Sequence, residues 1–314
     1  MRALVVSNMQ PDSAHPERGS FVRDQVAALA DLDGLQVELY EFAPGAPALA
    51  RATLELRRRF AGRGGKRFDV VHAHFGLSAW PALAVPAHVR ALTVHGSDLR
   101  HPRTRAITLA ALPTVDLLAA VSCELVRELP SRQQARAQVL PCGVDVERFR
   151  PLPRAQARAE LGLDPERRYL LFPSDPARPE KRYDLASGLA AELDVELLTL
   201  GGVQPALVPL SVNCADAVLV TSEREGFGLA VLEALACNVP VLATPVGIHQ
   251  RALDDLPGTL CAPFERTRWR VALEQVLARG DPRVEGRPRA ERYSAGRMGE
   301  RVLEAWRAAR KRAG

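Results

Sequence analysis

The sequence predicts an α/β protein with two doubly wound domains, each built on a parallel sheet, and three observations support this prediction. The chain has 314 residues, more than one ordinary hydrophobic core needs. Short β-branched apolar runs alternate with amphipathic segments, a pattern typical of βαβ units. A Pro-, Arg- and Ala-rich stretch over 145–165 separates two such series, so we expect a linker near residues 146–166.

The expected strands fall in order along both series. In the first series they lie at 4–8, 37–42, 70–75, 91–96, 117–122 and 138–143, and in the second at 169–175, 195–201, 217–222, 239–247 and 258–263. We therefore expect an N-terminal domain over 1–150 and a C-terminal domain over 151–292. A terminal helix over 293–314 is expected to pack back on the N-terminal domain.

Two doubly wound domains of this kind are expected to face a central cleft. Ligands of such sheets bind beyond the carboxyl ends of the strands. Motifs that carry chemistry should therefore directly follow strands and line that cleft.

The composition is that of a globular protein, with 47% hydrophobic and 25% charged residues. No apolar run is long enough to span a bilayer, and the apolar start of the chain is too short for the core of a secretion signal. We therefore expect a cytoplasmic protein. The five cysteines are scattered and odd in number, so we expect small buried residues rather than a disulfide framework.

The chain is basic, with a net charge of +5 and a pI of about 9.2. Much of the charge lies in clusters at 57–59, 63–67 and 307–312. Aromatic residues are only 5% and no nucleic-acid reading module is recognisable, so we expect no nucleic-acid partner. Two alternatives remain open: solvated helix faces, or attraction to an anionic acceptor or membrane surface. A membrane contact would place the protein peripherally at the inner face of the membrane.

The most informative segment runs over 218–237, from a buried strand through a glycine-containing turn into a helix. The turn places free backbone N–H groups at a helix N-terminus, where phosphates bind. Gly226 and Gly228 let the backbone approach a ligand closely. Glu225 would either be a solvated cap or accept hydrogen bonds from sugar hydroxyls. Glu233, further along the helix, is placed to accept both ribose hydroxyls of a nucleotide.

The run E-G-F-G-L-x-x-L-E-A that begins at Glu225 resembles the signature of family 4 glycosyltransferases, as does the Cys-Asn-Val-Pro-Val run after it. These are retaining enzymes with the GT-B fold of two Rossmann-like domains. The resemblance implies that Glu225 binds the donor sugar and Glu233 the ribose. It also implies that the backbone amides around Phe227, Gly228 and Leu229 bind the distal phosphate.

A charged loop follows the first strand of the second series. Arg178 and Lys181 in this loop can neutralise a diphosphate and stabilise it as a leaving group. The alternative is a charged loop that simply enters a helix. The resemblance implies that Lys181 takes the place of the family's diphosphate lysine. The family arginine usually lies near Asp175 and Pro176, neither of which is basic, so Arg178 is the candidate to replace it.

The N-terminal half contributes a glycine and three histidines. Gly19 resembles the glycine of the family loop that lies under the donor phosphates. His72 and His74 share one face of an expected strand, which leaves packing, acceptor contact or metal binding open. No third ligand is obviously placed, so we expect no metal site. His95 matches the family histidine that contacts the donor sugar, and the alternative is a hydrogen-bonded histidine at a strand end.

Ser97 and Asp98 follow the same strand as His95 and are candidates for acceptor contact. Cys142 stands where the family turn usually has Asn, so any contact made by that Asn is lost or taken over by backbone. Only a short helical piece separates the strands expected at 195–201 and 217–222, where typical relatives carry an extra strand and helix. The C-terminal domain is therefore expected to be shorter by about one strand–helix unit. This compact form most resembles enzymes of bacterial cell-surface polysaccharide or teichuronic-type assembly.

The resemblance implies a retaining transfer of a sugar from a nucleoside-diphosphate sugar, UDP- or GDP-linked, to a hydroxyl acceptor. The expected acceptor is a carbohydrate or a lipid-linked glycan of the cell surface. No tightly bound cofactor and no metal are expected. Two rival functions remain open: a GT-B nucleotide-sugar epimerase, and a non-catalytic nucleotide-sugar-binding protein.

Overall fold

The computed structural model describes residues 1–60 and 67–313. Arg63, part of one basic cluster noted above, lies outside the described residues. The chain divides into two compact units. The first comprises Met1–Ser13, Arg18–Gly143 and Ala295–Gly314, and the second comprises Ala14–Glu17 and Val144–Ser294.

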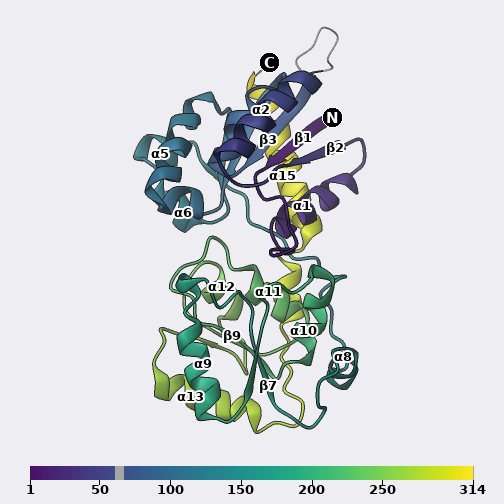
Figure 1. The fold of residues 1–314 in the computed structure, drawn as a ribbon, viewed down its shortest axis with the longest axis vertical. Coiled ribbons are helices and arrows are strands. Elements are labelled where there is room, and N and C mark those ends of the chain that lie inside the picture. The colour runs from purple at the N-terminus through teal and green to yellow at the C-terminus, as the bar shows by residue number, and fades with distance from the viewer. Residues whose placement is uncertain (61–66, 314) are drawn as a thin grey trace. The chain divides into compact units, whose positions relative to one another are not determined.

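The first unit is built on a six-stranded parallel sheet (Figure 1). Its strands are β1 (Arg2–Ser7), β2 (Gln36–Glu41), β3 (Phe68–His74), β4 (Ala87–Val94), β5 (Leu117–Ala120) and β6 (Gln138–Val139). They lie in the order β2-β1-β3-β4-β5-β6. The chain order reverses between β1 and β3, and such a switch point is where doubly wound sheets bind ligands.

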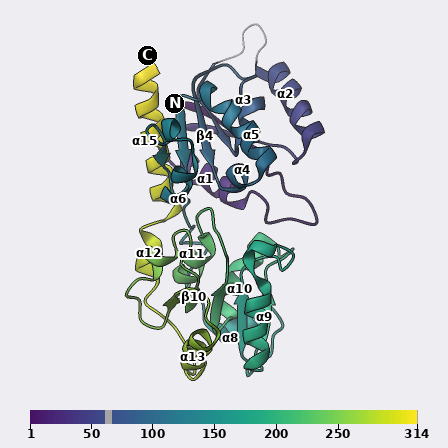
Figure 2. The same ribbon diagram turned by 90° about the vertical axis from the view of Figure 1, so that its left-hand side faces the viewer.

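Helices cover both faces of this sheet. They are α1 (Ser20–Ala30), α2 (Ala46–Phe60), α3 (Ala79–Ala82), α4 (Ser97–Arg100), α5 (Pro102–Ala111), α6 (Cys123–Glu128), α7 (Ser131–Gln134) and α15 (Ala295–Ala313). Figure 2 shows α2 and α3 on one side of the sheet and α15 on the other.

The C-terminal helix α15 completes the core of the first unit. Its buried residues Val302 and Trp306 pack in the same apolar cluster as Val5 of β1 and Val70 of β3. Because Gly299 has no side chain, α15 can approach α1 closely: a Cβ there would lie 3.1 Å from the carbonyl oxygen of Ala28. Burial of its apolar stripe therefore fixes α15 on this sheet.

The second unit is built on a five-stranded parallel sheet, one strand fewer than the first. Its strands are β7 (Tyr169–Phe172), β8 (Glu196–Thr199), β9 (Ala217–Val220), β10 (Val241–Ala243) and β11 (Leu260–Cys261). They lie in the order β11-β10-β9-β7-β8, so this sheet has its switch point between β7 and β9.

The helices of the second unit are α8 (Arg154–Glu160), α9 (Tyr183–Glu192), α10 (Val208–Cys214), α11 (Leu229–Ala236), α12 (His249–Leu253), α13 (Arg266–Leu277) and α14 (Arg287–Glu291). Leu189 of α9 and Trp269 of α13 pack in one apolar cluster with Leu170 and Leu219 of the sheet. Figure 1 shows α9 and α13 on one side of this sheet and α8 and α10 on the other.

The prediction of two parallel α/β sheets is confirmed, and each of the eleven strands named above overlaps a range expected from the sequence. Among the residues that the structure describes, no helix combines the length and the apolar character that a bilayer crossing requires.

The stretch expected as a linker differs from the prediction, because it contains helix α8 and packs as part of the second unit. Arg158 of α8 is only 2% exposed, and its Nη2 donates to Asp216 Oδ2 at 2.9 Å. Arg154 and Arg168 also pair with this fully buried carboxylate, which accepts from the backbone N–H of Tyr169 at 2.8 Å as well. A buried carboxylate requires such partners, and these tie α8 to the amino ends of β7 and β9.

We expect Asp216→Asn to lower the free energy of unfolding by about 3 kcal/mol, because it leaves the buried Arg158 without its counter-charge. The measurement is the midpoint of urea-induced unfolding. Asp281→Asn is the matched control, since Asp281 also lies near Arg154 but its side chain is 55% exposed. Equal midpoints for the two variants would contradict a structural role for the cluster.

Candidate active site

The second sheet brings Lys181 and Glu225 together at its switch point. Lys181 lies in the loop after β7, and Glu225 in the turn after the neighbouring strand β9. Lys181 Nζ is 2.6 Å from Glu225 Oε1, and the Ser222 hydroxyl donates to the same oxygen at 2.8 Å. The two charged side chains are only 14% and 11% exposed. Both lie beyond the carboxyl ends of their strands, where this fold binds ligands.

The pKa of Glu225 is held below its ordinary value. Burial by itself raises this pKa, but the positive charge of Lys181 and the hydrogen bonds from Lys181 and Ser222 outweigh it. Glu225 is therefore an ionised carboxylate that is mostly withdrawn from water. Such a group is a strong acceptor for hydroxyl donors that reach it.

Two residues that the sequence interpretation passed over hold this pair in place. The Thr221 hydroxyl lies 2.9 Å from the carbonyl oxygens of both Lys181 and Arg182, which fixes the loop that carries the lysine. Ser222 orients the Glu225 carboxylate. Their position at the end of the strand before Glu225 could have indicated this role. Hydroxyl residues at strand ends are, however, too common for that position alone to predict it.

The turn after Glu225 depends on glycine. Gly228 has φ +101° and caps the N-terminus of α11. A Cβ at Gly228 would lie 2.5 Å from His249 Nε2, and one at Gly247 would lie 2.3 Å from the carbonyl oxygen of Phe227. The turn thus packs closely against Gly247 and the first residue of α12, and glycine is required at both contacts. Because Gly228 has no side chain to cap α11, the first N–H groups of this helix can bind an anion.

His249 is fully buried behind this turn, and no sequence motif had indicated it. Its Nδ1 lies 2.8 Å from the carbonyl oxygen of Thr244, so Nδ1 carries the proton and donates it. Burial is the main cause that lowers its pKa, so the ring is neutral. His249 therefore fills the space against Gly228 without adding charge beside Glu225.

The remaining donor-site candidates of this unit lie on the same turn and helix. Gly226 and Leu229 are half-buried, and Glu233 is half-buried on α11, one turn after Leu229. Phe227 is 6% exposed and its ring packs edge-on against Tyr293 at 6.1 Å. The side chain of Phe227 thus belongs to the core, which leaves its backbone for ligand contact.

The Arg178 side chain pairs within its own loop rather than with Glu225. The Arg178 side chain is 55% exposed, and its Nη2 donates to Glu180 Oε1 at 2.7 Å within the same loop. The expectation that Arg178 replaces the family arginine gains no support from this geometry. A contact with Glu180, two residues away, was available to satisfy the guanidinium locally.

In the first unit, three histidines form a stacked row. His72 and His74 lie on one face of β3, and His95 follows the adjacent strand β4. The ring centroids of His72 and His74 are 4.7 Å apart, and those of His74 and His95 are 5.1 Å apart. His72 and His74 are 0% and 1% exposed, whereas His95 is half-buried. Burial lowers the pKa of all three, so the row is neutral.

This burial corrects the expectation that His72 and His74 contact an acceptor, because neither side chain reaches the surface. Their partners are instead internal. The Trp306 indole N–H donates to His72 Nδ1 at 3.1 Å, and His72 Nε2 then donates to the Thr93 hydroxyl at 2.8 Å. His74 Nδ1 is 2.9 Å from His95 Nε2. Packing and hydrogen bonding, the other alternative for this pair, is what the structure shows.

Asp98 is also internal rather than at an acceptor surface, with 3% exposure. Its carboxylate accepts from the backbone N–H groups of His95 at 3.0 Å, Gly96 at 2.8 Å and Gly76 at 3.3 Å. Burial raises its pKa to about 6 although these hydrogen bonds oppose the rise. Asp98 therefore fixes the backbone that presents His95, while Ser97 stays exposed at the start of α4.

Gly19 occupies a backbone position that other residues avoid. Its φ is +72°, and a Cβ there would lie 2.5 Å from the carbonyl oxygen of Met9. Gly19 precedes α1, whose first turn brings Phe21 to within 4.9 Å of the His95 ring. The loop after β1 and the residue after β4 thus meet at the carboxyl end of the first sheet.

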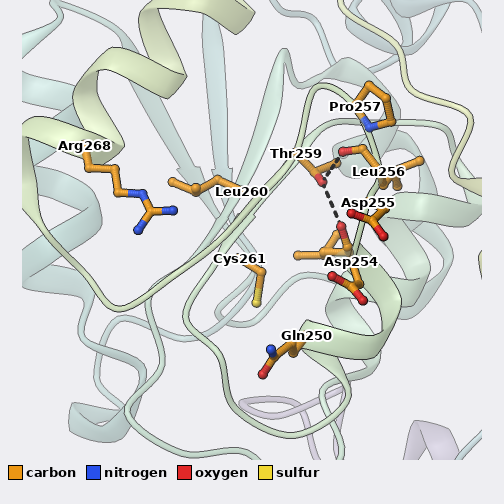
Figure 3. Close-up of a pocket in the computed structure, with 10 residues that line it drawn as sticks. Gln250, Asp254, Asp255, Leu256, Pro257, Thr259, Leu260, Cys261 and Arg268 are labelled. Carbon is orange, nitrogen blue, oxygen red and sulfur yellow. Dashed lines mark hydrogen bonds between the residues drawn. The ribbon is translucent and has the colours of Figure 1, made fainter.

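A hollow of about 530 Å³ lies at the β11 edge of the second sheet (Figure 3). Its walls come from α12, β11, the loop between them and Arg268 of α13. The Thr259 hydroxyl on its rim donates to the carbonyl oxygen of Leu256 at 2.8 Å. None of the residues expected to bind a ligand lines it, and β11 is two strands away from β9. The switch point, and not this hollow, is the site that the fold favours.

No metal cluster is found within residues 1–60 and 67–313: no three His, Cys, Asp or Glu side chains there are grouped to hold an ion.

Comparison with known proteins identifies the family. Residues 2–148 match the family model described as "Glycosyltransferase Family 4", and residues 158–293 match "Glycosyl transferases group 1". A relative from Frankia alni, named D-inositol 3-phosphate glycosyltransferase, is 30% identical over 83% of this chain and 76% of the relative. The chain belongs to glycosyltransferase family 4. It is therefore an enzyme that transfers glycosyl groups.

Further relatives agree with this assignment. A protein of the same name from Segniliparus rotundus is 28% identical over 96% of this chain and 78% of its own. Among solved structures, sucrose-phosphate synthase from Thermosynechococcus elongatus has a TM-score of 0.72 at 19% identity, over 98% of this chain and 99% of that one. The Anabaena protein HepE in complex with UDP-glucose has a TM-score of 0.68 at 15% identity, over 98% and 100%. These likenesses show that this family 4 enzyme has the GT-B fold.

We expect the stability contributed by Glu225 to depend on pH. Its pKa in the folded enzyme is lowered below 4.5, so the stabilisation is fully present above pH 4.5 and is lost as the pH falls through the lower folded value. Glu225→Gln should therefore lower the free energy of unfolding by about 2 kcal/mol at pH 7 and by less near pH 3. Urea unfolding of both proteins at several pH values measures the difference, and a pH-independent difference would contradict the ion pair.

Proposed function

We propose that this enzyme transfers a sugar from a nucleoside-diphosphate sugar, UDP- or GDP-linked, to a hydroxyl acceptor with retention of anomeric configuration. The Lys181–Glu225 pair, set beside the glycine-capped N-terminus of α11 at a switch point, is the observation that carries the proposal. Structures of similar fold, described as complexes with UDP-glucose or with ADP and acarbose, support a nucleotide-linked donor.

The proposed roles follow from the chemistry of each group. Lys181 supplies a positive charge for the diphosphate, and the amides of Phe227, Gly228 and Leu229 supply hydrogen-bond donors at a helix N-terminus. As a buried ionised carboxylate, Glu225 accepts from sugar hydroxyls. Glu233 on α11 accepts from the ribose.

Two residues of the first unit complete the proposed assignment. His95 contacts the donor sugar, since it is the histidine of the row that keeps exposed surface. Gly19 belongs to the loop after β1 that approaches the donor, and glycine keeps the shape of this loop because a side chain there would collide with Met9.

In the proposed reaction, the bond between the anomeric carbon and the diphosphate oxygen breaks, and both electrons leave with the diphosphate. Lys181 and the turn amides stabilise this developing negative charge. The departing diphosphate takes the acceptor proton while the acceptor oxygen bonds the anomeric carbon on the same face. Retention then needs no protein nucleophile, unlike glycosidases with their paired carboxylates. Glu225 stays a binding group because Lys181 and Ser222 already hold it as a carboxylate.

We propose that the acceptor is a carbohydrate or lipid-linked glycan of the cell surface. The curated relatives are named for D-inositol 3-phosphate, so this compound belongs in the acceptor panel beside lipid-linked glycans. Product formed only when an acceptor is present supports transfer. An isomeric nucleotide sugar formed without acceptor would indicate an epimerase, and donor binding without any turnover would indicate a binding protein.

We expect Lys181→Ala to lower kcat by about 100-fold or more, because the leaving diphosphate loses its charge partner. Steady-state kinetics with UDP- and GDP-sugars provide the measurement, and NMR of the product anomeric centre reports retention. Arg167→Ala is the matched control, since Arg167 is 66% exposed and pairs only with the partly exposed Glu196 among the described residues. A kcat for Lys181→Ala within threefold of the control value would refute the diphosphate role.

We also propose peripheral contact with an anionic membrane through two basic clusters of the first unit. One is Arg57–Arg59 in the last turn of α2, and the other is Arg310–Arg312 in the last turn of α15. The Phe60 ring at the end of α2 packs on Phe68 at 5.1 Å, and Arg310 pairs with Asp69. Both clusters therefore lie near the amino end of β3, whereas His95 follows the carboxyl end of β4.

Anionic vesicles are expected to retain the enzyme at low salt but not at high salt, because screening removes attraction between exposed charges. The double variant Arg57→Gln/Arg58→Gln should weaken retention about tenfold or more, at roughly 1 kcal/mol per charge near the surface. Sedimentation with phosphatidylglycerol vesicles, and with phosphatidylcholine vesicles for comparison, provides the measurement. The control Arg167→Gln/Arg270→Gln removes two partly exposed charges of the second unit, and equal weakening by it would contradict a localised surface.

A further inference from the structure

His74 is the one member of the histidine row that contacts both of the others. It stacks on His72 with an angle of 29° between the rings, and its Nδ1 lies 2.9 Å from His95 Nε2. It is 1% exposed, so it cannot itself touch a substrate in this structure. Only through His95 can it influence chemistry at the surface.

From this geometry we infer that His74 is a positioning residue: its hydrogen bond fixes the ring orientation and the tautomer of His95, so that His95 carries its proton on Nδ1. This inference rests on the proposed function of His95 as the sugar-contacting histidine. It assigns His95 a definite chemical role, the donation of a hydrogen bond from Nδ1 to an oxygen of the donor sugar.

The direction of the His74–His95 hydrogen bond follows from the partners of each nitrogen. Between two neutral rings, one nitrogen must donate and the other must accept. His74 Nε2 is buried and has no hydrogen-bond partner among the described residues. If His95 donated, this orphan nitrogen would carry a buried N–H, and buried N–H groups without partners are rare. His74 Nδ1 therefore donates, His95 Nε2 accepts, and the His95 proton resides on Nδ1.

Neutrality of both rings supports the same scheme. Burial lowers the pKa of His74 to about 3 and also lowers that of His95. A single proton per ring leaves only the two arrangements already considered. His95 Nδ1, the nitrogen not used by His74, has no protein partner in the described part of the chain.

Other contacts confine the His95 ring but do not set its proton. Phe21 and Phe75 lie against it at centroid distances of 4.9 and 4.6 Å, and Asp98 holds its backbone N–H. Phe75 has φ +67°, an unusual value for a residue with a side chain, and strain of this kind is concentrated at functional sites. Apolar rings and a backbone contact cannot choose between two tautomers, so that choice falls to His74.

His72 provides an internal comparison. Its two nitrogens are both satisfied, by the Trp306 indole and the Thr93 hydroxyl, and its polar atoms make no bond to His95. His72 thus has the burial and the strand of His74 without the proposed role. A substitution at His72 should affect stability without changing the His95 tautomer.

Two substitutions of His74 separate positioning from packing. In His74→Asn, an amide group can occupy the place of Nδ1 and keep the hydrogen bond, whereas His74→Gln places its amide near Nε2 and loses that bond. We expect His74→Gln to lower kcat about tenfold, in line with the effect of other supporting residues, while the KM for the donor changes less than threefold. His74→Asn should keep kcat within about threefold of the unchanged enzyme.

A direct readout of the tautomer comes from NMR of the ring nitrogens in 15N-histidine-labelled full-length enzyme. We expect the Nδ1–H form of His95 in the unchanged enzyme, in His74→Asn and in the control His72→Asn, and a mixture of tautomers in His74→Gln. An unchanged His95 tautomer in His74→Gln would overturn the inference. So would a loss of kcat in His74→Gln that merely follows its thermal stability and is matched by His72→Asn.

The NMR result does not depend on glycosyl transfer. If no donor and acceptor pair gives product, the proposed function fails while the tautomer measurement still decides whether His74 sets the state of His95. If transfer occurs but His74→Gln changes neither kcat nor the tautomer, the inference fails and the proposed function stands.

Discussion

The contact between Lys181 and Glu225 is the interaction on which the candidate site depends. It joins the loop after β7 to the turn after β9, the two strands that flank the switch point of the second sheet. Two charges this far withdrawn from water persist only as a pair with further hydrogen bonds, and the Ser222 hydroxyl donates one to the carboxylate. The Thr221 hydroxyl fixes the backbone of the loop that carries the lysine. The pair therefore holds the loop and the turn together. It also places the Lys181 ammonium and the Glu225 carboxylate near the N-terminus of α11.

In both sheets, groups that hold the fold and groups placed to bind a ligand lie at opposite ends of the strands. In the second, Asp216 and its arginines hold the amino ends of β7 and β9, while Lys181 and Glu225 follow the carboxyl ends. In the first, Arg310 and Asp69 lie at the start of β3, and His74 ends it. Strands that are buried on both faces consist mainly of apolar residues, which favours the strand ends for charged side chains that bind partners or ligands. Parallel packing thus separates the groups that hold the fold from those placed to bind a ligand.

Much of the fold could be predicted because its signals are local. Alternating strands and helices gave the two sheets, and the glycines around Phe227 gave the turn that the structure shows. The contacts of a side chain were harder to predict where its partner is distant in sequence, or where several partners were available to it. The stretch at 146–166 was expected as a linker because its Arg-rich composition is typical of a solvent-exposed segment. In the structure Arg158 is instead buried, because it pairs with the buried Asp216. His249 carried no local signal, since its role is to fill the space beside Gly228.

The sequence by itself determined the family, the order of the strands along the chain and the glycine-containing turn that carries Glu225. Each of these depends on residues that are contiguous in the chain. Only the tertiary structure decided that Lys181 rather than Arg178 pairs with Glu225, that Asp98 supports backbone, and that His72 and His74 are internal. Spacing along a strand shows which face a histidine is on, but not which neighbour receives its hydrogen bond. That choice is made between β3 and β4, across 21 residues of chain, where the folded sheet brings His74 Nδ1 to His95 Nε2.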